Sequence, residues 1–300
     1  MPCRSAPTAA EHPDADASAA IAFAPTPARS RLWSALSDIV ATLGLAPTSA
    51  RAADADIDAL RHHITVGAPL NTTISYLKAG NPTAPRLILV HGTPGSASGW
   101  SDYLMNPAPG FDVVALDRPG FGASGPEGAV TSLEAQAAAV VALFPTDGRR
   151  VVLLGHSLGG PIVAKVAAQH PARVAAVVLL AASLDPALEE INPMQWVGTW
   201  TAVRWALPRA IRNANAELIA LKPELQALAR LLPKVTAPVL IVHGTQDSLV
   251  PVANVPFMQA GLTGTRCVKT ELLDGQNHFL QWNSTGVVRR AMAWALASPC

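Results

Sequence analysis

The stretch Val151–Gly160, which reads VVLLGHSLGG, constrains the fold of this chain more than any other part of its sequence. A short apolar run ends in Gly-x-Ser-x-Gly, and Ala-rich helical sequence follows at once from Pro161 to His170. In this strand–turn–helix context the sharp turn strains the serine backbone and pushes the hydroxyl of Ser157 out at the end of the strand. The flanking glycines leave room for the strand and the helix to approach closely. The stretch therefore predicts a nucleophile elbow with Ser157 at its apex.

From about residue 57 onward, short strand-like runs alternate with helical ones. Continuous apolar strands bounded by helices are typical of a parallel sheet that is covered on both faces. We therefore expect an α/β fold with a doubly wound, mostly parallel sheet of about eight strands. For one of the helices, Thr131 and Glu134 predict a capping box. The expected strands are Ile57–Val66, Thr72–Lys78, Arg86–Val90, Phe111–Leu116, Arg150–Leu154, Val174–Ala182, Pro238–His243 and Cys267–Leu273.

Residues 186–234 break the alternation with several prolines, three tryptophans and two amphipathic stretches. Because this segment lies between two buried-looking strands, we expect a small helical lid over the carboxyl ends of the sheet. The core of the fold then comprises residues 54–185 and 235–300. For Trp196, Trp200 and Trp205, packing within the lid or against the body is favoured over contact with a substrate. The candidates for substrate contact are Trp196, Trp200 and Phe279.

Residues 1–53 differ from the rest of the chain. Residues 1–29 are rich in Ala, Pro, Ser and Asp and predict a flexible leader, after which Ser30 can cap a short helix. Residues 29–52 also fit an export signal, with arginines before an apolar stretch and a cleavage site after it. Asp38 lies inside that stretch, where a charge is costly. A cytoplasmic location is therefore the prediction, and export is the alternative.

Composition narrows the possible partners. The 300 residues are 50% apolar and 14% charged, with a formal net charge of +1, so we expect no nucleic-acid partner. No apolar run approaches the roughly 18 residues that span a bilayer, so no integral membrane segment is expected. The spacing of Cys and His matches no metal site, and the three cysteines, Cys3, Cys267 and Cys300, argue against a disulfide framework. The sequence predicts a small-molecule substrate, with neither metal nor cofactor, and indicates no oligomeric state.

Polar residues follow the ends of the predicted strands, where ligands bind in such sheets. A serine nucleophile needs a general base and a third group that orients the base. Of the eight histidines, His278 is the best-placed base, because it follows a strand-like run and a loop and precedes a closing helix. Asp247, after a strand and a turn, is the preferred acid, and Asp185 is its rival.

Asp117 is expected to bond backbone groups in its own turn. Structural roles are favoured for His91, His156, His170 and His243.

With these motifs in this order, residues 57–300 resemble the α/β-hydrolase superfamily. The matching parts are the oxyanion-loop motif His91-Gly92-Thr93-Pro94, the strand-4 turn at residues 117–122, and the series Ser157, Asp247 and His278. The resemblance implies a helical lid on an α/β-hydrolase fold and a serine nucleophile. It also implies an oxyanion hole formed by the backbone N–H groups of Thr93 and Leu158.

The motif His-Gly-x-Pro also resembles epoxide hydrolases and haloalkane dehalogenases, but both use an aspartate where this chain has Ser157. We therefore expect hydrolysis of a carboxylic ester of a small, largely apolar substrate through an acyl-enzyme. A carbon–carbon bond hydrolase is the first alternative, because the sequence around His278 is similar to that of ring-cleavage-product hydrolases. In that case Arg204, Arg209 and Arg212 could hold a carboxylate. A non-catalytic binding protein of the same fold is the second alternative, which the complete Ser–Asp–His series disfavours.

Overall fold

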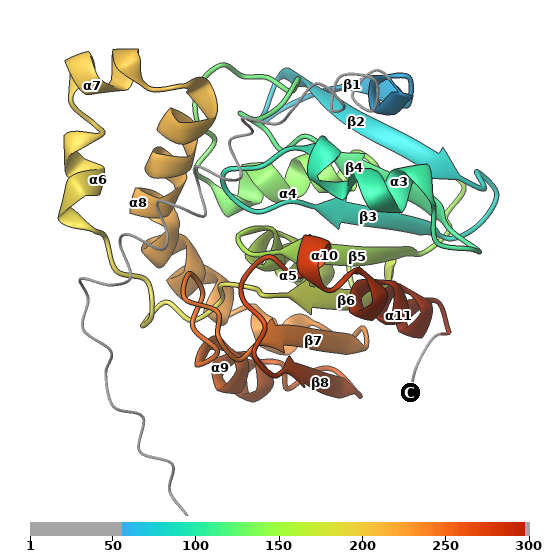
Figure 1. The fold of residues 1–300 in the computed structure, drawn as a ribbon. Coiled ribbons are helices and arrows are strands. Elements are labelled where there is room, and N and C mark those ends of the chain that lie inside the picture. Colours follow the sequence, from blue (N-terminus) through green and yellow to red (C-terminus); the bar gives the residue numbers. More distant parts are fainter. Residues whose placement is uncertain (1–55, 298–300) are drawn as a thin grey trace, which may run out of the picture. The chain divides into compact units, whose positions relative to one another are not determined.

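The computed structural model describes residues 56–297, so the expected leader, its helix and the alternative export signal lie outside the described residues. An eight-stranded sheet forms the centre of this part of the chain, in the order β1-β2-β4-β3-β5-β6-β7-β8 (Figure 1). Strand β2 runs antiparallel to both β1 and β4, and the remaining neighbours are parallel. The predicted α/β fold is confirmed. The strands are β1 (Arg61–Val66), β2 (Thr72–Gly80), β3 (Arg86–Val90), β4 (Asp112–Leu116), β5 (Val151–His156), β6 (Val174–Leu180), β7 (Val239–Gly244) and β8 (Val268–Leu273).

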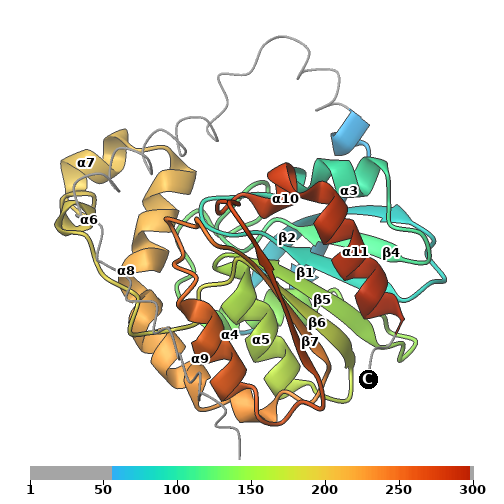
Figure 2. The ribbon, with the colours of Figure 1, turned by 60° about the horizontal axis from the view of Figure 1, so that its bottom comes forward.

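Helices cover both faces of the sheet, as expected for a doubly wound fold (Figures 1 and 2). One face packs against α4 (Leu133–Val141), α5 (Gly159–Gln169) and α9 (Asn254–Gly261). The opposite face packs against α3 (Ser101–Met105), α10 (Leu280–Asn283) and α11 (Thr285–Leu296). A 3-10 turn, η1 (Ala97–Trp100), leads into α3. Strands β4 and β5 are buried along their whole length, which explains the apolar runs at residues 113–116 and 151–154.

Two local predictions need correction. Residues 57–60 form a helical turn rather than the start of a strand, and this turn buries Ile57 in the apolar core. The N-cap of α4 is Ser132, not Thr131, because the helix begins one residue later than predicted. The hydroxyl of Ser132 accepts a hydrogen bond from the backbone N–H of Ala135 at 3.4 Å.

The segment between β6 and β7 is helical. It contains α6 (Pro193–Val197), α7 (Thr201–Ala206), α8 (Arg209–Ala229) and the 3-10 turn η2 (Leu232–Lys234). Helix α8 buries one face against the core, whereas α6 and α7 contain no buried residue. Both short helices lie on the side of α8 that faces away from the sheet (Figures 1 and 2).

The expectation that the tryptophans of this segment are packed is wrong. Trp196, Trp200 and Trp205 are 52%, 65% and 88% exposed. The physical reason is that α6 and α7 are short and, among residues 56–297, meet no surface large enough to cover their apolar side chains.

Cys267 is disulfide-bonded, which corrects the expectation drawn from the number and placement of the cysteines. An odd count still permits one bridge, and the other two cysteines lie outside the described residues. Within the described part of the chain, every helix is too short or too polar to cross a bilayer. The same residues contain no cluster of His, Cys, Asp and Glu that could hold a metal ion.

Candidate active site

Ser157 lies at the turn between β5 and α5. Its φ is +55°, in the left-handed region that non-glycine residues rarely adopt, as a nucleophile elbow requires. Close approach of strand and helix depends on Gly155, since a Cβ there would lie 2.3 Å from the carbonyl oxygen of Gly159. The backbone N–H of Ser157 donates to the carbonyl of Leu180 at 3.0 Å and so fixes the turn to the neighbouring strand β6. The local geometry thus presents the serine at the carboxyl end of the sheet.

The loop that follows β3 packs directly against this serine. A Cβ on Gly92 would lie 2.7 Å from the Cβ of Ser157 and 3.2 Å from its hydroxyl oxygen, so only glycine fits there. Thr93 comes next in the chain, and its hydroxyl is buried without a hydrogen-bond partner among the described residues. Leu158 stands at the N-terminus of α5, where backbone N–H groups have no acceptor within the helix. Both candidate oxyanion donors therefore come from segments next to Ser157.

His278 and Asp247 meet beyond the ends of β8 and β7. The Nδ1 of His278 lies 2.7 Å from Oδ2 of Asp247, and both side chains are buried. A carboxylate can only accept, so Nδ1 carries the proton and Nε2 keeps the lone pair that a general base needs. The other oxygen of Asp247 accepts backbone N–H groups from Leu249 at 3.0 Å and Val250 at 2.8 Å. The rival Asp185 instead accepts from the backbone of Ala187.

His156, the residue before Ser157, links the elbow to the His278 loop. Its Nε2 donates to the backbone carbonyl of His278 at 3.0 Å, and the two imidazole rings lie 4.7 Å apart. Phe279 touches His278 edge to face and is partly buried. Among the expected substrate-contacting residues, Phe279 therefore lies beside the candidate base, whereas Trp196 and Trp200 are exposed on the β6–β7 segment.

Burial lowers the pKa of His91, His156 and His243. The charge of nearby Arg118 lowers the pKa of His91 further, and nearby His278 does the same for His156. The unfolded chain takes up protons at these histidines below about pH 6.5, whereas the folded chain does not. Stability is therefore retained above about pH 6.5 and lost as the pH falls toward the folded pKa values. We expect the free energy of unfolding to fall by about 1 kcal/mol per histidine for each pH unit in that window, measured by urea denaturation.

The matched variants are His156→Gln and His63→Gln. The first removes one buried histidine and should lower this pH slope by about a third. His63 lies exposed on β1, so its replacement should leave the slope unchanged. A free energy of unfolding that stays constant over this window would contradict the assignment of neutral, buried histidines.

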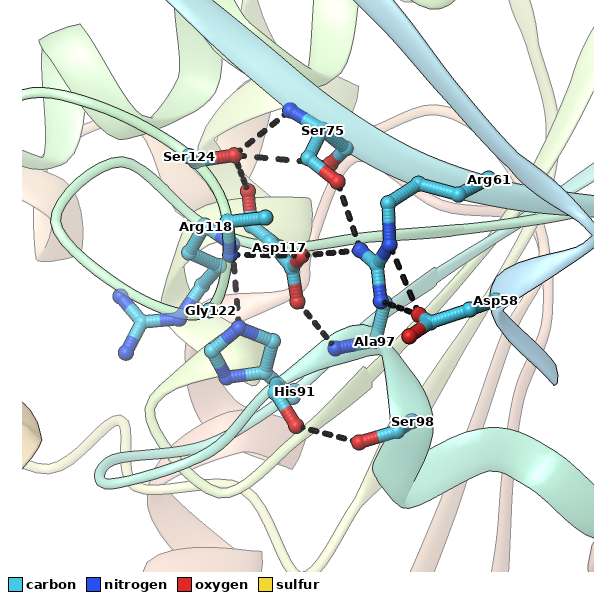
Figure 3. A network of polar contacts seen from close by, with 12 residues as sticks. Asp58, Arg61, Ser75, His91, Ala97, Ser98, Asp117, Arg118, Gly122 and Ser124 are labelled. Carbon is cyan, nitrogen blue, oxygen red and sulfur yellow. Dashed lines mark hydrogen bonds and ion pairs between the residues drawn. The ribbon is translucent and has the colours of Figure 1, made fainter. Parts of the chain in front are cut away.

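Asp117 fixes the turn after β4, as predicted. Its carboxylate accepts backbone N–H groups from Ala97 at 2.7 Å and Ala123 at 3.0 Å, and it pairs with Arg61 at 2.8 Å (Figure 3). The backbone N–H of Arg118 donates to Nε2 of His91 at 3.0 Å, which confirms a structural role for that histidine. In Figure 3 the Arg118 guanidinium points away from Asp117, to the other side of the turn.

On that side, Arg118 forms a fully buried ion pair with Glu217 of α8. The two guanidinium nitrogens lie 2.7 and 2.9 Å from the two carboxylate oxygens, and one of them also donates to the carbonyl of Gly92 at 3.0 Å. Gln136 donates to the same carboxylate at 3.0 Å. A chain of contacts thus runs from the inserted helix α8 through Arg118 to the loop that packs on Ser157.

The Arg118–Glu217 pair is absent from the sequence-based predictions, although the sequence contains one signal for it. The buried positions of α8 recur at helical spacing, and a glutamate stands among them where an apolar residue is expected. An unpaired carboxylate there would be costly, so the pattern requires a buried cation, which only the fold identifies as Arg118. The buried side chains of α8 are Asn213, Ala214, Glu217, Leu221, Leu225 and Leu228.

Comparison with known proteins adds three findings. A family model described as alpha/beta hydrolase fold matches residues 85–204. The chain is 30% identical over 213 residues to the pimeloyl-[acyl-carrier protein] methyl ester esterase of Citrobacter koseri, covering 58% of this chain and 80% of that protein. It is 24% identical over 254 residues to the 2-hydroxy-6-oxononadienedioate/2-hydroxy-6-oxononatrienedioate hydrolase of Cupriavidus pinatubonensis, covering 69% and 85%. Three other curated relatives are matched over only 30% to 49% of their length.

Among solved structures, the monoacylglycerol lipase of Paleococcus ferrophilus has a TM-score of 0.62 at 21% identity, covering 75% of this chain and 99% of that one. This likeness concerns the fold alone. Together with the family model and the esterase relative, it shows that the chain belongs to the alpha/beta hydrolase superfamily.

Proposed function

We propose that this protein is a serine hydrolase that cleaves a carboxylic ester of a small, largely apolar substrate through an acyl-enzyme. Ser157 is the nucleophile, His278 the general base and Asp247 the group that orients it. The observation that carries this proposal is the 2.7 Å contact between Asp247 and His278, which leaves Nε2 free to accept a proton. The esterase relative supports an ester substrate.

In the first half of the reaction, Nε2 of His278 removes the proton of Ser157 as the hydroxyl oxygen attacks the ester carbonyl. The backbone N–H groups of Thr93 and Leu158 hold the negative oxygen that develops. His278 then gives its proton to the departing alkoxide, which leaves as the alcohol. In the second half, His278 takes a proton from water as the water attacks the acyl-enzyme, and it returns that proton to the oxygen of Ser157 as the carboxylic acid leaves.

The carbon–carbon hydrolase alternative has support from one relative but not from the arginines that it would use. Arg209 donates to four backbone carbonyls of the turn after β4, and both Arg209 and Arg212 pair with Glu127. Of the three arginines, only Arg204 is exposed and has no ion pair among the described residues. An arginine clamp for a substrate carboxylate is therefore not assembled, and ester cleavage is favoured.

We further propose that residues 186–234 act as the lid. This segment follows the carboxyl end of β6, the same edge of the sheet from which Ser157 and Asp247 emerge. The Arg118–Glu217 pair and the hydrogen bond from Asn213 to the carbonyl of Gly120 at 2.8 Å fasten α8 to the core. Helix α8 is then the fixed part of the lid, and α6 and α7 are its outer part.

Phe279 beside His278, together with the burial of His278 and Asp247, supports a preference for apolar substrates. Esters with apolar acyl and alcohol groups should have a kcat/KM at least tenfold above that of isosteric esters with a carboxylate, because a buried charge without a partner is costly. A panel of p-nitrophenyl and methyl esters measures this. Higher kcat/KM for the charged members would contradict the proposed substrate class, and no turnover by any ester would favour a binding protein.

The Arg118–Glu217 pair should affect turnover as well as stability. Arg118→Lys and Glu217→Gln should each lower kcat by roughly 10- to 100-fold, because displacement of the Gly92 loop moves the oxyanion donors away from the reacting carbonyl. KM should change by less than about threefold, since the substrate pocket keeps its lining. Steady-state kinetics below the melting temperature of each variant measures both constants.

The matched control is the ion pair between Arg86 and Asp112, 2.6 Å apart at the amino ends of β3 and β4. Arg86→Gln should lower the melting temperature but keep kcat within about twofold of wild type, because it lies at the opposite end of the strands. Two results would show that the Arg118–Glu217 pair does not position the Gly92 loop. One is an equal loss of kcat in the variants of both pairs, and the other is a loss of stability alone in the Arg118 and Glu217 variants.

A further inference from the structure

The outer part of the β6–β7 segment presents a concentrated apolar surface. In the described part of the chain, five of the nine exposed large hydrophobic side chains fall within residues 191–205. Apolar side chains scattered singly over a surface are ordinary, whereas five of them on or next to two successive short helices favour an interaction site. We call this group the α6–α7 surface; it comprises Ile191 (37% exposed), Met194 (64%), Trp196 (52%), Trp200 (65%) and Trp205 (88%).

The chemistry of this surface is that of tryptophan. An indole combines a large apolar body with one N–H donor, and at a buried site that donor finds an acceptor. Trp282, which is 42% exposed, has such an acceptor, since its Nε1 donates to the carbonyl of Gly99 at 2.9 Å. Within the described residues, the indole nitrogens of Trp196, Trp200 and Trp205 have no such partner. Side chains of this kind suit the boundary between lipid chains and headgroups, where the body is covered and the N–H is hydrated.

The charges around the surface point to the same kind of partner. From Ile191 to Ala216 the sequence contains three arginines and no carboxylate, and Glu190 directly precedes the stretch. Arg209 and Arg212 both pair with Glu127, whereas Arg204, exposed beside Trp205, has no ion pair among the described residues. A cation within an apolar surface complements phosphate headgroups. A symmetric dimer through this surface would instead bring the Arg204 side chains of both copies into one apolar contact. Residues 191–216 of neither copy could supply a carboxylate to pair with them.

We infer that the α6–α7 surface docks this protein on membranes that contain anionic phospholipids, with the tryptophans at the headgroup boundary and Arg204 beside lipid phosphates. Docking of this kind is peripheral, because α6 and α7 are far too short to span a bilayer. It is a property of the outer part of the segment and does not depend on the chemistry proposed for Ser157.

Cosedimentation of the full chain with vesicles tests the inference. Vesicles of phosphatidylcholine mixed with phosphatidylglycerol should bind the protein several-fold more tightly than phosphatidylcholine alone, and added salt should weaken that difference. The double variant Met194→Ser with Trp205→Ser should bind the mixed vesicles at least tenfold more weakly, because it removes two apolar side chains of the surface that are 64% and 88% exposed. Arg204→Gln should weaken binding by roughly fivefold on mixed vesicles only.

The matched control replaces two exposed apolar residues elsewhere, Met105 (49% exposed) and Leu272 (51%), with serine, and should bind like wild type. The single variant Trp205→Ser keeps the test valid if the double variant unfolds, since this side chain is 88% exposed. Ser157→Ala protein should bind vesicles normally, so failure of the proposed chemistry stays distinguishable from failure of docking. Absence of vesicle binding, equal losses in both double variants, or a tryptophan-dependent dimer that ignores vesicles would overturn the inference.

Discussion

Ser157→Ala should lower the turnover of a short-chain p-nitrophenyl ester by roughly 10⁴- to 10⁶-fold. The physical reason is that the alanine variant cannot form the acyl-enzyme, so only the oxyanion donors and substrate binding remain to accelerate attack by water. The strained turn depends on Gly155 and on backbone hydrogen bonds rather than on the serine hydroxyl, so the fold should persist. Steady-state kinetics, together with circular dichroism of the purified variant, measures both effects.

Ser98→Ala is the matched control for this variant. Ser98 is exposed and follows the same loop that packs on Ser157, and its loss should change turnover by less than about twofold. A loss smaller than about tenfold in the Ser157 variant would remove this residue from the mechanism.

Asp247→Asn should lower turnover by roughly 10⁴-fold. The amide of asparagine can donate to Nδ1 of His278, which moves the ring proton to Nε2, where the lone pair is needed. The amide oxygen can still accept the backbone N–H groups of Leu249 and Val250, so the loop after β7 should keep its conformation. Kinetics over a pH series, with the melting temperature as a check on folding, provides the measurement.

Asp185→Asn separates the two candidate acids. Asp185 accepts from the backbone of Ala187 in its own loop, which an asparagine can also do. Its replacement should therefore leave turnover within a few-fold of wild type. The reverse pattern, a large loss at Asp185 and a small one at Asp247, would assign the orienting role to the rival.

Much of the fold could be predicted because the buried strands have a strong local signal. The strand Arg86–Val90 is predicted with both ends correct, since a continuous apolar run lies between Pro85 and the turn at His91. The elbow is predictable for the same reason, because a strand, a Gly-x-Ser-x-Gly turn and a helix follow one another without interruption. Strand β5 continues to His156, beyond the predicted end at Leu154, since the strand runs into the turn itself.

The remaining features depend on contacts between distant parts of the chain. Arg118 and Glu217 are separated by 99 positions, and no local pattern shows that α8 folds back onto the turn after β4. Exposure of the tryptophans is unpredictable for a related reason. A tryptophan-rich stretch predicts burial, and it is the position of α6 and α7 beyond α8 that leaves these side chains exposed among the described residues (Figures 1 and 2).

The most direct test of the central claim is peptide mass mapping after inactivation with a fluorophosphonate, which reacts with a serine only when a neighbouring base activates it. The claim that Ser157 is activated by His278, held in place by Asp247, predicts one adduct on each chain, located on Ser157. The adduct should form far more slowly in the His278→Ala and Asp247→Asn variants. Loss of esterase activity with Ser157 unmodified, or labelling of Ser157 at an unchanged rate in both variants, would contradict the account.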